Sequence, residues 1–360
     1  MILLNPGPVN VSPRVTRALL RGDLCHREPE FSDLLDGVRC KLVTAFAPCG
    51  DWEAVPITGS GTLALEAAVC SSVAQGRQML VVVNGVYGER ILEMARVHGI
   101  DTVEVRAEWT ERPDPERVAE AIRRHPAVEV VALVHHETTT GLLNPVSEIG
   151  EVVRRAGRRL LVDSISGLGG DPIDLGDGTV SICVGVANKC IQGLPGIGFV
   201  LATRAELERM AAIAPRSVYM NLRRHHEAHR RRAVPFTAAV QVLYALDEAL
   251  DELLEETVDG RIRRYRAAAD RLRRGFASMG LALLLPESHR SNSITSLVLP
   301  RGTTYGALHD HLKQDGFVVY EGQGHLAAEI FRVANMGALA DDDFDRFLLS
   351  LGRAIGIRSA

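Results

Sequence analysis

Three short stretches of the sequence carry side chains that could do chemistry. Lys189 and Asp163 each come at the end of an apolar run, and residues 59–62 (Gly-Ser-Gly-Thr) precede a helical pattern. A lysine in apolar surroundings can act as an amine nucleophile, and a buried carboxylate can pair with a cation. Glycines before a helix let its free N–H groups bind an anion. Taken singly, each has an ordinary explanation: a surface lysine, a turn cap and a helix cap.

Together the three stretches meet the requirements of one cofactor, pyridoxal phosphate. That cofactor needs a lysine for a Schiff base, an acid opposite its ring nitrogen and an anchor for its phosphate. The sequence therefore predicts Lys189 and Asp163 as catalytic residues, and Ser60, Gly61 and Thr62 as the phosphate cradle. The cradle has neither the lysine of a P-loop nor the third glycine of a dinucleotide fingerprint, so it is neither of those motifs.

The elements that must position these residues follow from the hydrophobic pattern of the first 235 residues or so. Apolar runs without alternation indicate strands covered on both faces, and strands that alternate with helices indicate a parallel α/β sheet. The predicted strands are 79–83, 128–134, 160–163, 180–187 and 199–202, and the predicted helices include 63–70, 88–98, 114–124 and 146–156. In such sheets ligands bind at the carboxyl ends of the strands, where Asp163 and Lys189 stand.

The pattern changes near residue 237, which indicates a second domain. Helices are predicted at 238–254, 261–276, 305–314 and 341–351, and strands at 281–285, 293–299, 317–320 and 330–333. We therefore expect an N-terminal arm (1–15), a large domain (16–254) and a smaller α+β domain (255–360). The length of 360 residues fits about two domains.

Composition excludes several classes of protein. Hydrophobic residues make up 46% of the chain, which excludes a disordered chain, and the net charge of −4 gives no basic excess for nucleic acid or an anionic membrane. We expect no membrane span and no signal peptide, and hence a cytoplasmic protein. The six cysteines form no C-x-x-C pair, and we predict reduced thiols and no metal site.

Longer stretches extend the pattern around the candidate residues. They are 5–8 (NPGP), 84–90 (NGVYGER), 136–141 (HETTTG), 162–166 (VDSIS), 187–193 (ANKCIQG), 235–237 (PFT) and 331–335 (FRVAN). Along nearly its whole length the chain resembles class V aminotransferases of fold type I, and most of all their 2-aminoethylphosphonate:pyruvate transaminase branch. The resemblance implies an α/β fold with a large, mostly parallel sheet domain and a smaller C-terminal α+β domain.

The resemblance also implies a role for each matching residue. Lys189 would carry the cofactor and move a proton between the substrate carbon and the cofactor, while Asp163 would pair with the ring nitrogen. Tyr87 would stack on the ring, and Thr138 would lie near the ring hydroxyl. The alternatives are that Tyr87 packs in the core and that Thr138 is a turn residue bonded to its own backbone.

Two further residues would complete the site by the same resemblance. Thr237 would reach the cofactor phosphate of a neighbouring subunit, which implies a homodimer with shared active sites; otherwise it caps the helix that follows. Arg332 would bind the acid group of the substrates, since a guanidinium suits both carboxylate and phosphonate; otherwise it forms a structural ion pair.

The implied reaction is ping-pong transamination of small-molecule amine and keto-acid substrates, between 2-aminoethylphosphonate/phosphonoacetaldehyde and pyruvate/alanine. Residues 24–31 depart from the branch as we expect it, which leaves substrate and direction open. Alternatives are an alanine– or serine–glyoxylate-type aminotransferase, a cysteine desulfurase, and a cofactor-free scaffold. The desulfurases typically carry histidines at the places of Tyr87 and Asn188. The arginine-rich segment 223–232 is predicted to be a solvated or subunit-facing loop, with a steering patch for phosphonates as the alternative.

Overall fold

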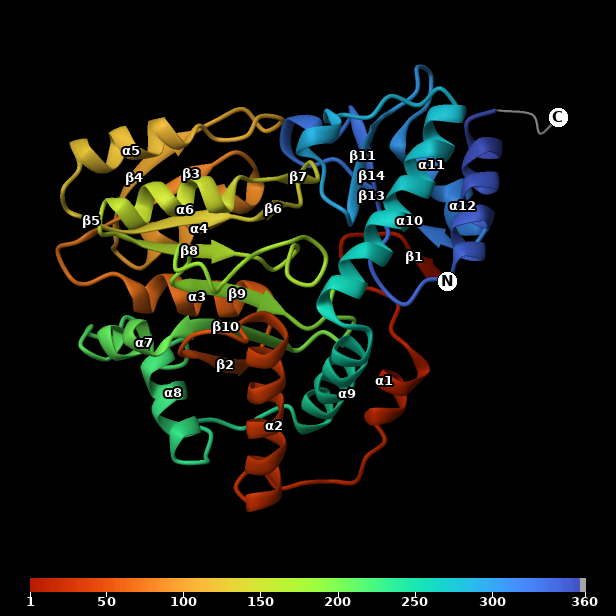
Figure 1. Cartoon of the computed structure of the whole chain (residues 1–360). Coiled ribbons are helices and arrows are strands. Elements are labelled where there is room, and N and C mark those ends of the chain that lie inside the picture. The colour runs from red at the N-terminus through yellow and green to blue at the C-terminus, as the bar shows by residue number, and fades with distance from the viewer. Residues whose placement is uncertain (357–360) are drawn as a thin grey trace.

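A seven-stranded sheet dominates the computed structural model, which describes residues 1–356 (Figure 1). Its strands, in spatial order, are β2 (Trp52–Thr58), β10 (Ile197–Thr203), β9 (Ile182–Val186), β8 (Arg159–Asp163), β5 (Val128–Val134), β3 (Gln78–Val83) and β4 (Asp101–Arg106). β10 pairs antiparallel with both of its neighbours, and the other neighbouring pairs are parallel. The prediction of a mostly parallel α/β sheet is confirmed.

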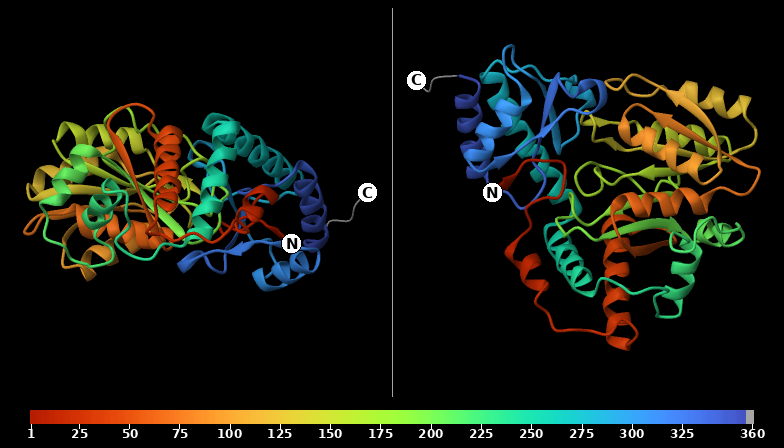
Figure 2. Two further views of the ribbon diagram at one scale, coloured as in Figure 1. Left: turned by 90° about the horizontal axis from the view of Figure 1, so that it is seen from below. Right: turned by 180° about the vertical axis from the view of Figure 1, so that it is seen from behind.

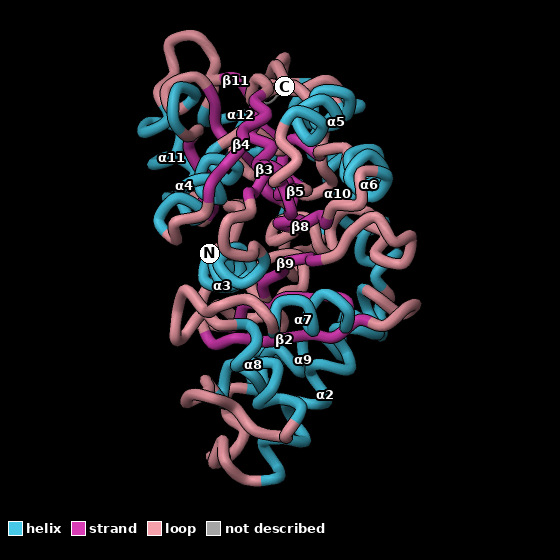
Figure 3. The backbone as a smooth tube through the Cα atoms, turned by 90° about the vertical axis from the view of Figure 1, so that its left-hand side faces the viewer, coloured by secondary structure: helices cyan, strands magenta, loops and turns pink. Residues whose placement is uncertain are grey.

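Helices cover both faces of this sheet (Figure 3). One face packs against α3 (Gly61–Ser72), α4 (Val86–Val97), α7 (Arg204–Ala211) and α8 (Leu222–Arg230). The other packs against α2 (Pro29–Phe46), α5 (Pro115–Arg124), α6 (Val146–Arg155) and α9 (Val240–Glu256), with α1 (Pro13–Ala18) beside α9. The apolar runs show no alternation because both faces of each central strand are buried.

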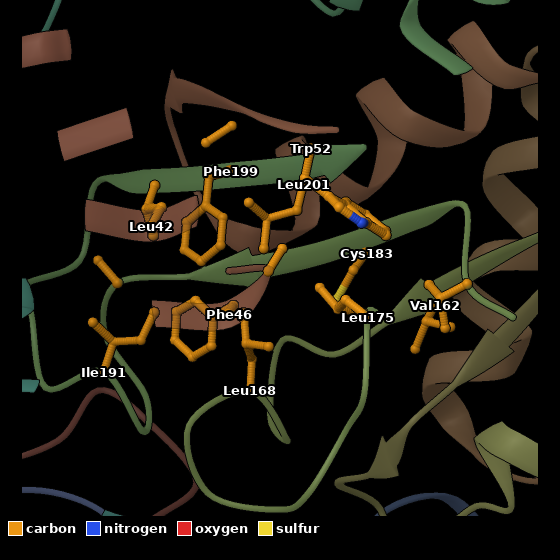
Figure 4. Close-up of a cluster of buried hydrophobic side chains, with 14 of the residues drawn as sticks. Leu42, Phe46, Trp52, Val162, Leu168, Leu175, Cys183, Ile191, Phe199 and Leu201 are labelled. Carbon is orange, nitrogen blue, oxygen red and sulfur yellow. The ribbon is translucent and has the colours of Figure 1, made fainter. Parts of the chain in front are cut away.

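The side chains of β3 illustrate this double burial. Leu80 and Val82 join one hydrophobic cluster, while Met79, Val81 and Val83 join the cluster on the opposite face. Figure 4 shows part of the first cluster, in which Phe199 and Leu201 of β10 lie over Phe46 of α2 and over Leu168 and Leu175 of the segment between β8 and β9. Burying a side chain of this size is worth about 1.5–3 kcal/mol, so these clusters hold the strand ends in place.

The C-terminal part forms a separate small sheet with its own core (Figure 2). Its strands are β11 (Ile294–Val298), β14 (Ile330–Ala334) and β13 (Tyr320–Glu321), and its helices are α10 (Val258–Ser278), α11 (Tyr305–Gln314) and α12 (Asp341–Ala354). Two short pairs complete the strands: β1 (Ile2–Leu3) with β12 (Phe317–Val318), and β6 (His136–Glu137) with β7 (Leu142–Leu143). Short 3-10 turns span Glu287–His289 and Gly324–Leu326.

Three sequence predictions are wrong. Residues 281–285 form no strand but a single bridge from Leu283 to β11, because Pro286 follows and has no N–H to donate. The predicted strand 317–320 is divided, since β12 pairs with β1 and β13 pairs with β14. The segment 223–232 is mostly helix α8, whose N-cap is Asn221.

The division of the chain into domains stays a proposal. We propose an N-terminal arm (1–15), a large domain (16–254) and a small domain (255–360). The separate cores on either side of α10, and the pairing of β1 with the C-terminal part, support it. Within residues 1–356, no helix combines the length and the apolar character needed to cross a bilayer.

Every strand of the large sheet except β10 runs in the same direction, because β10 is antiparallel to both of its neighbours. The carboxyl ends of five of these strands, β2, β3, β5, β8 and β9, precede candidate residues at one edge of the sheet. The segments after these ends begin at residues 59, 84, 135, 164 and 187. Of the stretches that the sequence singled out in the large domain, all except 235–237 therefore lie at one edge of the sheet.

One glycine sets how closely α3 approaches this sheet. A Cβ added to Gly198 of β10 would lie 2.7 Å from both Ala64 Cβ and the Ser60 carbonyl oxygen. Gly198→Ala must push the start of α3 away, and we expect a loss of about 1–3 kcal/mol in the free energy of unfolding, measured by urea denaturation.

The matched control is Gly37→Ala. Gly37 lies inside α2, and an added Cβ would meet nothing within 4 Å. Here alanine should raise the free energy of unfolding by about 0.5–1 kcal/mol, because it restricts the unfolded chain. A Gly198→Ala chain as stable as the native one would show that α3 can shift without cost.

Candidate active site

A cavity of about 230 Å³ lies at the carboxyl edge of the large sheet, facing the C-terminal part. It is lined from the large sheet by Ser60, Gly61, Thr62, Leu65, Tyr87, Arg90, Asp163, Ile165, Val186, Asn188 and Lys189, and otherwise by Pro6, Gly7, Tyr320, Gln323 and Arg332. The cavity thus brings together all the predicted site residues except Thr138 and Thr237.

Lys189 lies in the turn after β9, with only 9% of its surface exposed. Its Nζ donates a hydrogen bond to Ser166 Oγ at 2.6 Å. Burial lowers the pKa of this amine to about 8; the nearby Asp163 opposes that shift, while Arg332 and Arg90 add to it. An amine with this pKa is in part neutral near pH 7, which is the form that attacks a carbonyl.

Asp163 is the last residue of β8 and is 3% exposed. Its Oδ1 accepts a hydrogen bond from the Ile165 N–H at 3.0 Å. Burial raises the pKa of this carboxyl to about 6. The Ile165 N–H, Lys189 and Arg90 act in the opposite direction and lower the pKa. A buried carboxylate of this kind can hold a proton on a ring nitrogen opposite it.

The start of α3 offers a site for an anion. Ser60 is the N-cap, and its hydroxyl accepts a hydrogen bond from the Leu63 N–H. The N–H groups of Gly61 and Thr62, in the first turn, have no acceptor within the helix. A Cβ on Gly61 would lie 3.1 Å from Ile165 and Val186, so glycine lets this turn sit against β9.

Tyr87, the second residue of α4, presents its ring to the cavity. Lys189 Nζ lies 5.9 Å from the ring centroid. Arg90, one turn later on α4, places its Cζ 4.7 Å from the same centroid. The ring is half-buried: it packs against the hydrophobic cluster on this face of the sheet and also lines the cavity.

Arg332 enters the cavity from β14 of the small sheet and is 2% exposed. Its Nε donates to the Glu321 carbonyl at 2.9 Å, and its Nη1 donates to the Thr138 carbonyl at 2.8 Å and to Gln323 Oε1 at 3.1 Å. Among residues 1–356 no carboxylate lies within 4 Å of this guanidinium, so the alternative of a structural ion pair does not hold. Its Nη2 donates no hydrogen bond within the described chain.

The remaining two predicted residues lie outside the cavity wall. Thr138 is buried after β5, where its hydroxyl contacts Ser166 Oγ at 2.5 Å. Thr237 is exposed and lines a different hollow with Tyr219 and Phe236. It does not cap the following helix, whose N-cap is Ala239.

Sequence reasoning gave no role to Arg90 and Ser166. Arg90 lies three residues after Tyr87 in stretch 84–90, and Ser166 lies three residues after Asp163 in stretch 162–166. A spacing of three on a helix puts Arg90 on the same face as Tyr87. Arg90 Nη1 lies 3.5 Å from Thr62 Oγ1, beside the start of α3.

The arginines of segment 223–232 are all exposed, as the prediction of a solvated segment requires, although most of the segment is helix and not loop. On α8 three histidines point inward, and two of them bond to the Tyr219 carbonyl and to Glu53. No group of three or more His, Cys, Asp or Glu side chains within residues 1–356 is arranged to hold a metal ion.

These residues fit pyridoxal phosphate by their chemistry. The cofactor has a phosphate, a ring nitrogen and an aldehyde. The start of α3 supplies free N–H donors, Asp163 a buried carboxylate, and Lys189 a buried amine of lowered pKa. Tyr87 adds a flat face beside that amine.

Comparisons with known proteins agree with this chemistry. A family model for class V aminotransferases matches residues 22–339. A relative named 2-aminoethylphosphonate–pyruvate transaminase, from Syntrophobacter fumaroxidans, is 37% identical over 352 residues, which cover 96% of this chain and 94% of the relative.

Solved structures give the same result. An alanine–glyoxylate aminotransferase from Nostoc superposes with a TM-score of 0.93 at 28% identity, covering 98% of this chain and 95% of the other. A pyridoxamine–pyruvate aminotransferase from Mesorhizobium loti gives a TM-score of 0.92 at 30% identity, covering 99% and 92%. The chain therefore belongs to the class V aminotransferases, pyridoxal phosphate-dependent enzymes of fold type I.

Proposed function

We propose that this aminotransferase moves an amino group between 2-aminoethylphosphonate/phosphonoacetaldehyde and pyruvate/alanine. The observation that carries the proposal is a pair of guanidinium groups, Arg332 and Arg90, that line the cavity of Lys189. Neither lies within 4 Å of a carboxylate among the described residues. Two such forks suit the extra charge of a phosphonate better than one would. The name of the Syntrophobacter relative supports the same substrate.

The same proposal assigns the site residues. When bound, pyridoxal phosphate supplies a ring that withdraws electrons from the substrate carbon next to the amine. Lys189 Nζ takes the proton from that carbon, and Asp163 keeps a proton on the ring nitrogen. The N–H groups and hydroxyls of Ser60, Gly61 and Thr62 hold the phosphate.

The proposed function also gives roles to three further residues of the site. Tyr87 stacks on the ring, Thr138 stands near the ring hydroxyl through its contact with Ser166, and Arg332 binds the acid group of both substrates in turn. Because the two substrates use one cavity, a single arginine can serve both half-reactions of a ping-pong cycle.

We also propose that the enzyme is a homodimer with shared sites. Thr237 is exposed and lies away from the cavity of its own chain, which supports a role toward a partner's cofactor phosphate. The partners of the enzyme are then its small amine and keto-acid substrates and a second copy, in the cytoplasm, with no role for nucleic acid or membranes.

An absorbance titration tests the substrate. The purified holoenzyme should lose its visible cofactor band on addition of 2-aminoethylphosphonate, because the bound cofactor takes up the amino group. Lys189→Ala should show no such turnover. If alanine or serine removes the band and 2-aminoethylphosphonate does not, the substrate is a carboxylate amino acid, as in the glyoxylate aminotransferases.

Arg332→Lys tests the shared anion contact. Lysine keeps the charge and loses the two-pronged geometry, so we expect kcat/KM to fall about a hundredfold in both half-reactions. Separate single-turnover measurements with the amine and with pyruvate would check this. An equal cofactor absorbance in the variant controls for loss of the cofactor, and a loss confined to one half-reaction would contradict a shared role.

Lys189→Met tests the cost of burying the amine. Lys189 has a pKa of about 8 in the folded chain against 10.5 for an ordinary lysine. Between pH 8 and pH 10.5 the amine is largely protonated in the unfolded chain and largely neutral in the folded chain. The buried lysine therefore lowers the free energy of unfolding by its full amount below pH 8, and this loss becomes smaller as the pH rises to 10.5. Without cofactor, Lys189→Met should gain about 2–3 kcal/mol in the free energy of unfolding at pH 7.

The control for that measurement is Lys313→Met. Lys313 is exposed on α11, and its replacement should leave the free energy of unfolding unchanged within about 0.5 kcal/mol at every pH. If Lys189→Met gained nothing at pH 7, the amine would not be buried at a cost.

A further inference from the structure

Ser166 supplies the only hydrogen-bond acceptor of Lys189 Nζ among the described residues. Its Oγ lies 2.6 Å from Nζ, while Asp163 acts on the amine without a contact. Ser166 is itself 4% exposed, so water has little access to replace it. The contact is therefore made between two enclosed groups, where a hydrogen bond to a charge is strong.

The rest of the structure fixes Ser166 from several sides. Its carbonyl accepts hydrogen bonds from His136 Nδ1 at 3.3 Å and from the Cys190 thiol at 3.5 Å. The turn that carries it is closed by bonds from the Gly167 and Leu168 N–H groups to the Ser164 carbonyl. A side chain on so fixed a backbone has little freedom to move away from Lys189.

Ser166 also links Lys189 to the substrate-binding side of the cavity. Its hydroxyl contacts Thr138 Oγ1 at 2.5 Å, and the Thr138 carbonyl accepts from Arg332 Nη1 at 2.8 Å. A continuous path of contacts therefore runs from the lysine in the large sheet to the arginine in the small one.

We propose that Ser166 is a positioning residue, which holds the free amino group of Lys189 at a fixed place relative to Arg332. The inference rests on the proposed function, because it concerns the steps in which Lys189 is not bound to the cofactor and must carry a proton. No role in bonding to substrate or cofactor is assigned to Ser166.

The contact has a consequence for the protonation of Lys189. As an acceptor, Ser166 favours the ammonium form, and its removal should lower the pKa of Lys189 further. The other groups that face this amine remain in a Ser166 variant: Asp163 and Cys190 favour the charge, Arg90 and Arg332 oppose it, Tyr87 presents its ring, and His136 lies behind Ser166.

Ser164 offers a matched control on the same turn. It is also buried, and its hydroxyl bonds to His135 Nδ1 at 2.9 Å instead of to Lys189. Ser164→Ala therefore removes a buried hydroxyl of the same kind without touching the amine. Any effect of Ser166→Ala that Ser164→Ala shares is a general effect of losing such a hydroxyl.

The test measures the pKa of Lys189 directly on the full chain without cofactor. The sequence has three lysines, Lys41, Lys189 and Lys313, so trace acetylation across a pH series followed by peptide mass spectrometry reports each amine separately. Exposed Lys313 provides the reference for reagent reactivity. We expect the pKa of Lys189 to fall by about one unit in Ser166→Ala and to stay unchanged in Ser164→Ala.

Steady-state kinetics of the holoenzymes provides the second readout. Ser166→Ala should lower kcat about tenfold or more with KM changed less than twofold, and the acid limb of the kcat–pH profile should move to lower pH. If Ser166→Ala does not fold, Thr138→Val is measured in its place. This variant frees the Ser166 hydroxyl to rotate, so we expect the pKa of Lys189 and kcat to fall as in Ser166→Ala, with about half the pKa shift.

Two results would overturn the proposal. One is a Lys189 pKa and kcat in Ser166→Ala, or in Thr138→Val if that replaces it, that match the native enzyme. The other is an equal change in Ser164→Ala. A native chain that binds no pyridoxal phosphate would instead refute the proposed function, so the two failures are distinguishable.

Discussion

A buried amine at the carboxyl edge of the sheet is the constraint on which the rest of the site depends. Removing a charge from water costs several kcal/mol, and Lys189 meets that cost in part by a lowered pKa and in part by its bond to Ser166. Asp163 supplies attraction, whereas Arg90 and Arg332 supply repulsion. Burial outweighs these opposing charges and lowers the pKa of the amine to about 8, so that part of it is neutral near pH 7. The parallel sheet makes this arrangement possible by bringing the ends of separate strands to one edge.

The sequence predicts the five inner strands of the large sheet because they are buried on both faces, but it does not predict the two edge strands, β2 and β4. β5 and β8 lie at the predicted residues, and Asp163 stands at the end of its strand as expected. The direction of β10 does not follow from its apolar run, since a doubly covered strand has the same pattern either way. The connection 187–196 between β9 and β10 holds no helix, and a parallel pair needs a crossover of about a dozen residues or more. That length is the signal for the reversal.

The residues alone predict Lys189 and Asp163, which lie at or just beyond strand ends, whereas Tyr87 and Arg332 come from the family resemblance. Lys189, Asp163 and Tyr87 line the cavity, but nothing in the pattern around Ser166 shows that its hydroxyl lies between Lys189 and Thr138. The segment 223–232 is predicted as a loop from its charge, although its spacing of buried residues is helical. Its arginines suggest a loop, while the spacing of His225 and His229, both buried, is that of one helix face.

Arg332 connects the small sheet to the large domain by a hydrogen bond. It belongs to the small sheet, yet its Nη1 bonds to the Thr138 carbonyl, beyond β5 of the large one. Its other hydrogen bonds go to Glu321 of β13 and to Gln323, which follows β13, and both partners belong to the C-terminal part. A shift of the small sheet would therefore move the Arg332 guanidinium relative to Lys189 and would break the Thr138 contact. In the role proposed for Arg332, a substrate acid group at Nη2 would add a contact to the same guanidinium, so substrate binding and the joining of the two sheets would favour one arrangement.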